Sequence, residues 1–196
     1  MRTKFISALL TLLLGSITIN SFSQEPAVPL KPALLVIDIQ NAFLPSITEA
    51  DREQAMMNIN YYIAQFRNHG CPVILVYHHG EEWGVRPGTD IFEFPSSVMI
   101  NADDPKVIKT YPDGFNKTDL DKILKEQGCN VLFLTGLSAV GCVLATYMGA
   151  MNHDYKAFMV KDAIMSHNTE YTRKIEEIFG AVSPEVVTLV LESARK

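Results

Sequence analysis

Short apolar runs recur along the chain, and most of them end in a polar or charged residue. Six such runs, one of them a two-residue piece, occur at positions 33–37, 72–77, 107–108, 131–134, 156–160 and 186–191. A continuous apolar run without alternation is typical of a strand that is buried on both faces of its sheet. The pattern therefore predicts six strands.

Between these runs, apolar residues recur at the spacing of a helix. Helices are predicted at positions 50–69, 118–127, 139–152 and 169–179. Gly70 and Gly180 are typical residues for helix ends, and Thr118 is the expected N-cap of the second helix. Because strands and helices alternate, the chain is predicted to form a parallel sheet with helices on both faces.

One long stretch, residues 79–105, has no clear periodicity. It is rich in glycine, proline, aromatic and acidic residues. In a small domain such a segment is usually a functional loop region. We expect substrate specificity to reside there, although the sequence does not identify the substrate.

The first residues of the chain have the composition of an export signal. Arg2 and Lys4 precede an apolar run at 6–14, and the small residues Ser21 and Ser23 stand at −3 and −1 before Gln24. This pattern predicts a signal peptide at 1–23 and a mature domain at 24–196 that is secreted or periplasmic, without membrane insertion after processing. An uncleaved membrane anchor is the alternative, although the run is short for a transmembrane helix.

Composition narrows the possible functions. The chain is 47% hydrophobic and 20% charged, the profile of a soluble globular protein, and about 170 residues after processing suffice for one domain. The net charge is −5, and no basic run occurs. Since phosphate binding needs clustered Lys and Arg, nucleic acid is not an expected partner.

The chain has three cysteines, so at least one of them stays unpaired. Cys71 and Cys129 each follow a glycine and precede an apolar strand, and we interpret both as small core residues. Cys142 differs, because it lies near the start of a predicted helix that follows a strand. An exposed thiol would be noteworthy in an oxidising compartment.

Three reactive side chains fall near the carboxyl ends of predicted strands. Asp38 ends the first strand, Lys109 ends the short one, and Cys142 follows the strand that leads to Gly136. Ligands of open parallel sheets bind outside the carboxyl ends of the strands. The topology therefore predicts that these three residues lie close together, at one edge of the sheet.

Each of the three has a chemical role available to it. A helix N-terminus is expected to lower the pKa of the Cys142 thiol and to offer backbone N–H groups to an oxyanion. Asp38 could take the thiol proton and return it to a leaving group, and Lys109 would keep Asp38 ionised. Spacing alone leaves the ordinary alternatives open: a buried small Cys, a turn Asp and a solvated Lys.

Four segments resemble the motifs of isochorismatase-like cysteine hydrolases. They are LVIDIQNAF at 35–43, KTYPDGF at 109–115 with Thr118 and Leu120, LTG through GCV at 134–143 with Thr146 and Ala150, and KDA at 161–163 with Ser166. The motifs occur in the family's order from about residue 32 to 168. This resemblance is specific for the superfamily but not for a substrate.

The resemblance implies a three-layer α/β/α sandwich, Rossmann-like, on a parallel sheet of about six strands. It also implies an Asp38–Lys109–Cys142 triad and a cis peptide between Leu137 and Ser138, which would direct the Ser138 and Cys142 amides into one oxyanion hole. Relatives named for isochorismatase activity often carry Asp at the nucleophile position. The Cys here therefore favours hydrolysis of an amide-type C–N bond through a thioester.

The sequence departs from the family pattern at some positions. Ala139 stands where many relatives have Thr, and Gly149 stands where Asp is frequent. Nicotinamidases of the family bind a metal through Asp-x-His and further His residues soon after the first motif. No His lies between Asp38 and His69, so we expect neither a metal nor another cofactor.

Several other residues are candidates for the substrate pocket. Phe43, Trp83 and Tyr111 could line an apolar wall, with Phe92 and Phe94 as further candidates, although ordinary packing explains them equally well. The residue types alone do not decide between a wall of the substrate pocket and ordinary core packing.

The histidines have no assigned role from sequence. His78 and His79 follow the second strand, but adjacent residues of an extended chain point to opposite sides, so both are not expected to bind one metal. His167 is expected at the rim of the site.

The sequence also leaves other functions open. An exported binding protein that keeps the fold without catalysis is the main alternative, although all three triad residues are present. A redox role for Cys142 would need a second cysteine nearby, and Cys71 and Cys129 are expected at the opposite edge of the sheet. The partner is predicted to be a small-molecule substrate, and the protein a homo-oligomer, as its relatives usually are.

Overall fold

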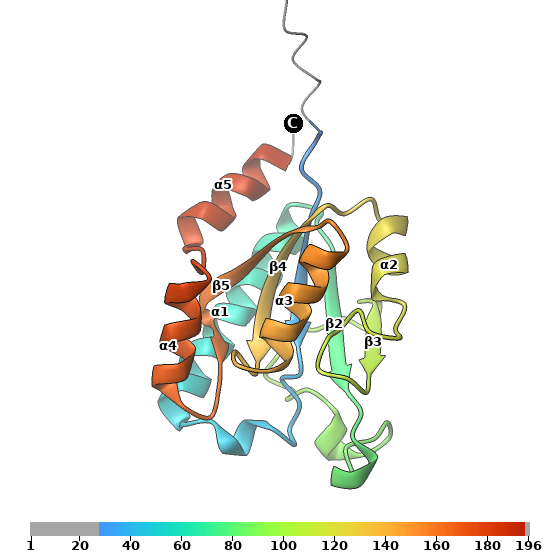
Figure 1. The fold of residues 1–196 in the computed structure, drawn as a ribbon, viewed down its shortest axis with the longest axis vertical. Helices are drawn as coiled ribbons and strands as arrows, with labels where there is room; N and C mark the ends of the chain where they lie inside the picture. The colour runs from blue at the N-terminus through green and yellow to red at the C-terminus, as the bar shows by residue number, and fades with distance from the viewer. Residues whose placement is uncertain (1–27, 195–196) are drawn as a thin grey trace, which may run out of the picture.

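The computed structural model describes residues 28–194. Its centre is a five-stranded parallel sheet with the strand order β3-β2-β1-β4-β5 (Figure 1). The strands are β1 (Pro32–Ile37), β2 (Val73–His78), β3 (Lys106–Lys109), β4 (Val131–Leu137) and β5 (Lys156–Met165). All residues of β1, β2 and β4 are buried, which explains why these strands have continuous apolar sequences.

Within residues 28–194, five α-helices and three short 3-10 helices accompany the sheet. The α-helices are α1 (Glu49–Asn68), α2 (Leu120–Glu126), α3 (Cys142–Asn152), α4 (Thr169–Ile178) and α5 (Pro184–Ala194). The 3-10 helices are η1 (Leu44–Ser46), η2 (Glu81–Trp83) and η3 (Asp90–Phe92). Among the described residues, no helix is both long and apolar enough to cross a bilayer. The predicted signal peptide at 1–23 lies outside the described residues.

The sheet separates two apolar clusters, as the predicted three-layer sandwich requires. Leu34 and Val36 of β1 face the cluster formed with α1 and α5, whereas Ala33, Leu35 and Ile37 face the cluster formed with α2 and α3. Successive residues of a strand point to opposite faces, so one apolar run supplies both cores. The α/β fold with helices on both faces is thereby confirmed.

The predicted sixth strand at 186–191 is wrong, because this run lies within α5. Val187 and Leu191, four residues apart, are buried on one face of the helix, while Leu189 remains 63% exposed. Pro184 takes the first helical position, where its missing N–H is no loss. Between α4 and α5, Val182 forms an isolated parallel bridge with Val160 of β5.

Two helix starts also differ from the prediction. The third helix begins at Cys142 rather than at position 139. The second begins at Leu120 after Asp119, so Thr118 is not the N-cap. The Thr118 hydroxyl still accepts a hydrogen bond from the Leu120 amide (3.2 Å) and donates one to the Gly114 carbonyl (2.5 Å).

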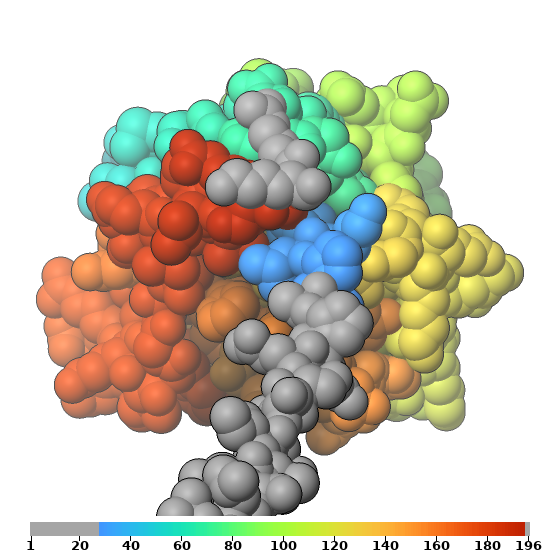
Figure 2. All heavy atoms as spheres, turned by 90° about the horizontal axis from the view of Figure 1, so that it is seen from above, coloured from blue at the N-terminus to red at the C-terminus, as the bar shows by residue number. Residues whose placement is uncertain are grey.

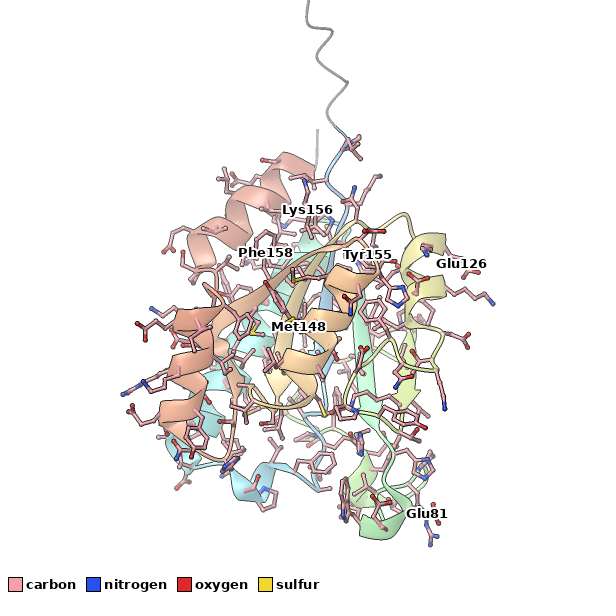
Figure 3. All side chains as sticks on the ribbon, viewed as in Figure 1. Glu81, Glu126, Met148, Tyr155, Lys156 and Phe158 are labelled. Atoms are coloured by element: carbon pink, nitrogen blue, oxygen red, sulfur yellow. The ribbon has the colours of Figure 1, made fainter. Side chains whose placement is uncertain are left out.

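The two edges of the sheet have different surroundings. Figure 2 looks onto the amino ends of the strands, where the start of β1 reaches the surface between α5 and the segment around α2. Cys71 and Cys129 precede β2 and β4 at this edge and pack on opposite faces of the sheet, in agreement with the predicted core role. In Figure 3, Tyr155 and Lys156 lie near the amino edge, whereas Glu81 lies in the loops beyond the carboxyl edge.

Candidate active site

Asp38 follows β1, the central strand of the sheet, and is only 3% exposed. Its backbone has a φ of 51°, a left-handed conformation that Asp adopts more readily than most residues. The Asp38 amide still donates to the Val76 carbonyl of β2 (2.9 Å). The strand therefore holds the backbone of Asp38 while the chain turns away from the sheet.

Lys109 ends β3, two strands away from β1, and is 1% exposed. Its Nζ lies 2.7 Å from Oδ2 of Asp38, which makes a fully buried ion pair. The other carboxylate oxygen of Asp38, Oδ1, is buried and has no hydrogen-bond partner among the described residues. One oxygen of this carboxylate is therefore available to receive a proton.

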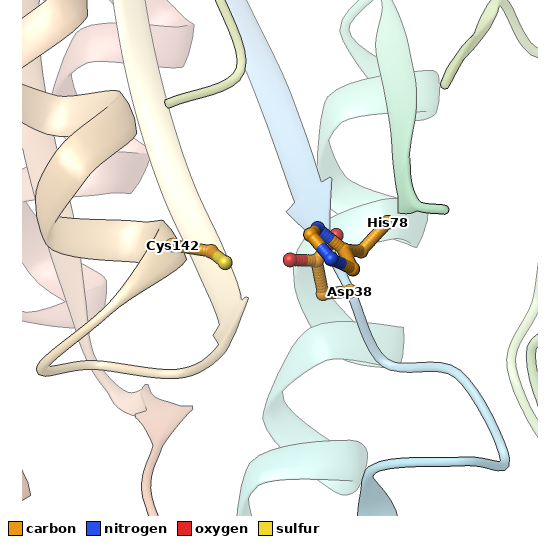
Figure 4. A group of neighbouring side chains, drawn as sticks. All are labelled: Asp38, His78 and Cys142. Carbon is orange, nitrogen blue, oxygen red and sulfur yellow. The ribbon is translucent and has the colours of Figure 1, made fainter. Parts of the chain in front are cut away.

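Cys142 is the first residue of α3 and is partly exposed. Its Sγ, a carboxylate oxygen of Asp38 and a ring nitrogen of His78 all lie within 4.8 Å of one another. Figure 4 shows one oxygen of the Asp38 carboxylate on the side toward the Cys142 sulfur, while the His78 ring overlaps the carboxylate in this view. The structure thus brings Asp38, Lys109 and Cys142 together, at the edge where the topology places them.

The chain between β4 and α3 is shaped by glycine and a cis peptide. Gly136 has a φ of 109°, and a Cβ there would lie 2.1 Å from the Ile37 carbonyl oxygen, so only glycine fits. The peptide between Leu137 and Ser138 is cis, as the resemblance implied. β4 can therefore pass close to β1 before the chain turns toward Cys142.

Several amides of the turn before α3 have no backbone acceptor. Gly141 and Val143 both donate to the Ser138 carbonyl (2.8 and 3.1 Å), and Ala139 donates to Met165. Among the described residues, the amides of Ser138, Val140 and Cys142 have no such acceptor. The resemblance assigned two of these N–H groups, those of Ser138 and Cys142, to an oxyanion hole.

Burial has the largest effect on the pKa values of Cys142 and Asp38. It raises the pKa of the Cys142 thiol to about 12, and the negative charge of Asp38 adds to this, while Lys109 opposes it. Burial also raises the pKa of Asp38, against the opposing effect of the Lys109 ammonium. Desolvation and the adjacent carboxylate therefore raise the pKa of the Cys142 thiol, which is the opposite direction from the lowering expected at a helix N-terminus.

His78 is an additional member of the site. Its Nδ1 lies 3.2 Å from Nζ of Lys109, and burial, together with the Lys109 charge, lowers the pKa of His78 to about 4. Gln40 fixes the His78 backbone, because its side chain donates to the His78 carbonyl (3.0 Å) and accepts from the His78 amide (2.7 Å). The sequence could have indicated a place in the site for His78, because His78 ends β2 just as Lys109 ends β3.

A cavity of about 250 Å³ opens at this edge of the sheet. Phe43 and Trp83 line it, as do Ser138 and His167, whereas Tyr111 does not. Tyr111 is 40% exposed, and its hydroxyl accepts a hydrogen bond from Lys117 (3.1 Å). The neighbouring Pro112 takes the place in the cavity wall that was expected for Tyr111.

Other candidate residues lie elsewhere. Phe92 and Phe94 stack on Tyr77 within the core, with the Phe94 ring centroid 4.1 Å from that of Tyr77. His79 pairs with Glu81 (3.0 Å), outside the cavity. These residues therefore support the loops around the site and do not form its wall.

The loop that carries Pro112 is tied to α3. The Gly114 amide donates to the Thr146 hydroxyl (2.9 Å), and the Asp113 carboxylate lies directly above Gly149. A Cβ at Gly149 would be 2.3 Å from Asp113 Oδ1. An Asp at position 149, which the resemblance gives as frequent in relatives, would therefore require the carboxylate of Asp113 to move.

Asp38, His78 and Cys142 also have the donor types of a metal site. However, the Lys109 ammonium already lies 2.7 Å from Asp38 and 3.2 Å from His78. A cation bound to these two side chains would have to displace Lys109 and to bear its repulsion. The arrangement fits proton transfer better than metal binding.

Comparison with known proteins gives a consistent result. Residues 32–184 match the isochorismatase domain. The chain is 33% identical over 148 residues to the uncharacterized isochorismatase family protein YddQ of Bacillus subtilis, covering 73% of this chain and 82% of that protein. It is 24% identical over 162 residues to the maleamate amidohydrolase of Pseudomonas putida, covering 71% and 75%.

Among solved structures, N-carbamoylsarcosine amidase from Thermoplasma acidophilum superimposes with a TM-score of 0.67 and 28% identity, over 79% of this chain and 95% of that one. The domain match covers most of the described residues, and the relatives share both sequence and fold with this chain. The chain belongs to the isochorismatase family of hydrolases.

Proposed function

We propose that this protein hydrolyses a small carbonyl compound at an amide-type C–N bond, with Cys142 as nucleophile and a thioester intermediate. The observation that carries the proposal is the buried Asp38–Lys109 ion pair beside the Cys142 sulfur, at the wall of a cavity. A nucleophile, a proton acceptor and a charge that orients the acceptor are the parts such a mechanism needs. Relatives named amidase and amidohydrolase support the reaction class.

The first half of the cycle forms the acyl-enzyme. The Cys142 thiol transfers its proton to the Asp38 carboxylate as Sγ bonds to the substrate carbonyl carbon. The resulting oxyanion accepts hydrogen bonds from the Ser138 and Cys142 amides. When the C–N bond breaks, Asp38 returns the proton to the leaving nitrogen, so that an amine or ammonia departs.

Water completes the cycle. Asp38 removes a proton from the water that attacks the thioester carbonyl, and the same two amides hold the second oxyanion. The C–S bond then breaks, and Asp38 returns the proton to the Cys142 sulfur while the acid product leaves. Lys109 carries its charge throughout and stabilises the carboxylate form of Asp38, which burial alone would disfavour.

A raised thiol pKa is compatible with this cycle. A proton acceptor next to the sulfur generates the thiolate only when a substrate is in place, so the resting enzyme need not hold a charged sulfur. Because Asp38 is desolvated, its raised pKa makes it a stronger base than an exposed carboxylate. The raised pKa of Asp38 therefore favours proton transfer, whereas the raised pKa of the Cys142 thiol opposes it, so the thiolate character develops only as Sγ bonds to the substrate carbonyl.

The test is ammonia release from a panel of small amides by purified protein. We expect Cys142→Ala to lose activity by about 10⁴-fold or more, since the nucleophile is removed. Cys71→Ala is the matched control, because it deletes a thiol at the opposite edge of the sheet and should retain kcat. Unchanged turnover by Cys142→Ala would refute the proposal.

A further inference from the structure

The charged side chains that line the cavity are unusual in kind. Within the part of the chain that the structure describes, no Lys or Arg lines it. The nearest ammonium, Lys109, is fully buried and already paired, because its Nζ contacts Asp38 (2.7 Å) and His78 (3.2 Å). Among the residues that line the cavity, no Lys or Arg is therefore left to pair with a negative group of a ligand, and the remaining nitrogen-bearing side chains are the imidazoles of His78 and His167.

The imidazole of His78 does not supply that missing cation. An ammonium can only donate, so Nδ1 of His78 must accept from Lys109, and the ring proton must reside on Nε2. The low pKa of His78, about 4, agrees with a neutral ring. His78 is consequently a neutral donor with a fixed tautomer.

The Nε2–H group of His78 has no hydrogen-bond partner among the described residues, and it is not one of the buried side-chain atoms that lack a partner. The ring lines the cavity, with Trp83 stacked on it (5.6 Å between centroids) and Phe43 at its edge (6.0 Å). A ligand in the cavity would meet an N–H donor between two aromatic walls.

We propose that the site takes small uncharged carbonyl compounds, without a carboxylate, and that the Nε2–H of His78 binds a second acceptor atom of the substrate. This inference rests on the proposed function. A carboxylate in the cavity would lose its hydration without gaining a charged partner, which is unfavourable. The negative Asp38 carboxylate nearby would add to that penalty.

A pair of alkylating agents tests the charge preference without requiring hydrolysis. Iodoacetamide and iodoacetate react at the same carbon but differ in charge. The rates at Cys142 are measured by peptide mass spectrometry at pH 8.5 and divided by the rates with glutathione. We expect the normalised ratio to favour iodoacetamide by about tenfold or more, because a site that lacks a counter-ion disfavours the anion. A normalised ratio near one, or in favour of iodoacetate, would overturn the inference.

A substitution that adds the missing cation sharpens the test. Ser46 is exposed and lines the cavity, so Ser46→Arg should raise the relative rate of iodoacetate several-fold. Thr188→Arg on α5 is the matched control, since it adds the same charge far from the cavity and should leave the ratio unchanged. An equal effect of both variants, or of neither, would contradict a local charge preference.

The role of His78 is tested by His78→Asn. The Asn side-chain oxygen can still accept from Lys109, while the donor at Nε2 is lost. We expect KM for a neutral amide to rise about tenfold, with kcat within about threefold, as one neutral hydrogen bond to substrate is removed. An unchanged KM would refute the binding role.

The proposed amide hydrolysis and the proposed preference for uncharged substrates would be refuted by different results. Absence of amide hydrolysis with an intact iodoacetamide preference would refute the proposed function and leave the charge preference standing. Efficient hydrolysis of carboxylated amides such as succinamate, in preference to the neutral succinamide, would refute this inference and leave the Cys142 mechanism standing.

Discussion

Cys142 and Cys129 make an instructive pair, because both thiols are desolvated and only one is placed to react. Burial raises the pKa of Cys129 to about 11 and that of Cys142 to about 12. Cys129 lies at the amino edge of the sheet within an apolar cluster. Cys142 lies at the carboxyl edge, beside a carboxylate and a cavity.

The comparison shows that the resting pKa does not distinguish the reactive thiol from the structural one. What differs is the neighbour that can accept the proton. Among the described residues, one buried oxygen of Asp38 has no hydrogen-bond partner, and Lys109 holds the carboxylate beside the sulfur. We therefore assign the reactivity of Cys142 to its partners and the inertness of Cys129 to their absence from its described surroundings.

With the Cys142 nucleophile left in place, removing its proton acceptor should have the largest effect. Asp38→Asn keeps the side-chain shape but cannot take the thiol proton, so kcat should fall by roughly 10³-fold, within the range for loss of a general base. Ammonia release measures the change, and circular dichroism checks that the variant folds. Retention of more than about a tenth of kcat would place the base elsewhere.

The backbone of the reactive edge should be the next most sensitive point. Gly136→Ala would place a Cβ 2.1 Å from the Ile37 carbonyl oxygen at a φ of 109°. Since neither strand can move easily in a buried sheet, we expect a loss of about 3 kcal/mol or more in the free energy of unfolding. Urea denaturation measures it. Gly128→Ala is the control, because φ is also positive there (68°) but no atom lies within 4 Å.

The pH profile tests the carboxylate directly. Asp38 must be unprotonated to take the thiol proton, so kcat/KM should fall as pH drops through its pKa. Because burial raises that pKa, the midpoint should lie above the ordinary value of about 3.9. Lys109→Met removes the opposing charge, so the acidic limb should move to still higher pH. A shift toward lower pH in this variant would contradict the assigned role of Lys109.

Substitution of the other buried thiol, Cys129, should have the smallest effect. Cys129→Ser buries a hydroxyl in an apolar cluster and should lower the free energy of unfolding by about 1–2 kcal/mol. Its kcat should remain at the wild-type value, in contrast to Asp38→Asn. A loss of turnover in a folded Cys129→Ser protein would break the distinction between the two cysteines.

Much of the fold could be predicted from the sequence, because fully buried strands leave continuous apolar runs. The run at 186–191 failed this rule, since a short apolar segment has no periodicity that separates a strand from a helix. Here Pro184 starts a helix, and only Val187 and Leu191 are buried. Length and composition alone could not decide this case.

The site was predictable to the extent that topology fixed it. Asp38 and Lys109 end strands of one parallel sheet, and this is why residues distant in sequence meet. The thiol pKa was not predictable, because desolvation depends on how deeply the sulfur is covered. The inward position of Pro112 rather than Tyr111 depends on tethers to α3 through Gly114, which the sequence does not display.

The most direct test of the central claim is to trap the acyl-enzyme. A small neutral ester or amide is mixed with the protein, the reaction is quenched in acid, and tryptic peptides are analysed by mass spectrometry. We expect an acyl group on Cys142, sensitive to hydroxylamine, that is absent from the peptides of Cys71 and Cys129. Turnover that proceeds with acyl groups on another residue, or undiminished in Cys142→Ala, would contradict the role of Cys142 as the nucleophile.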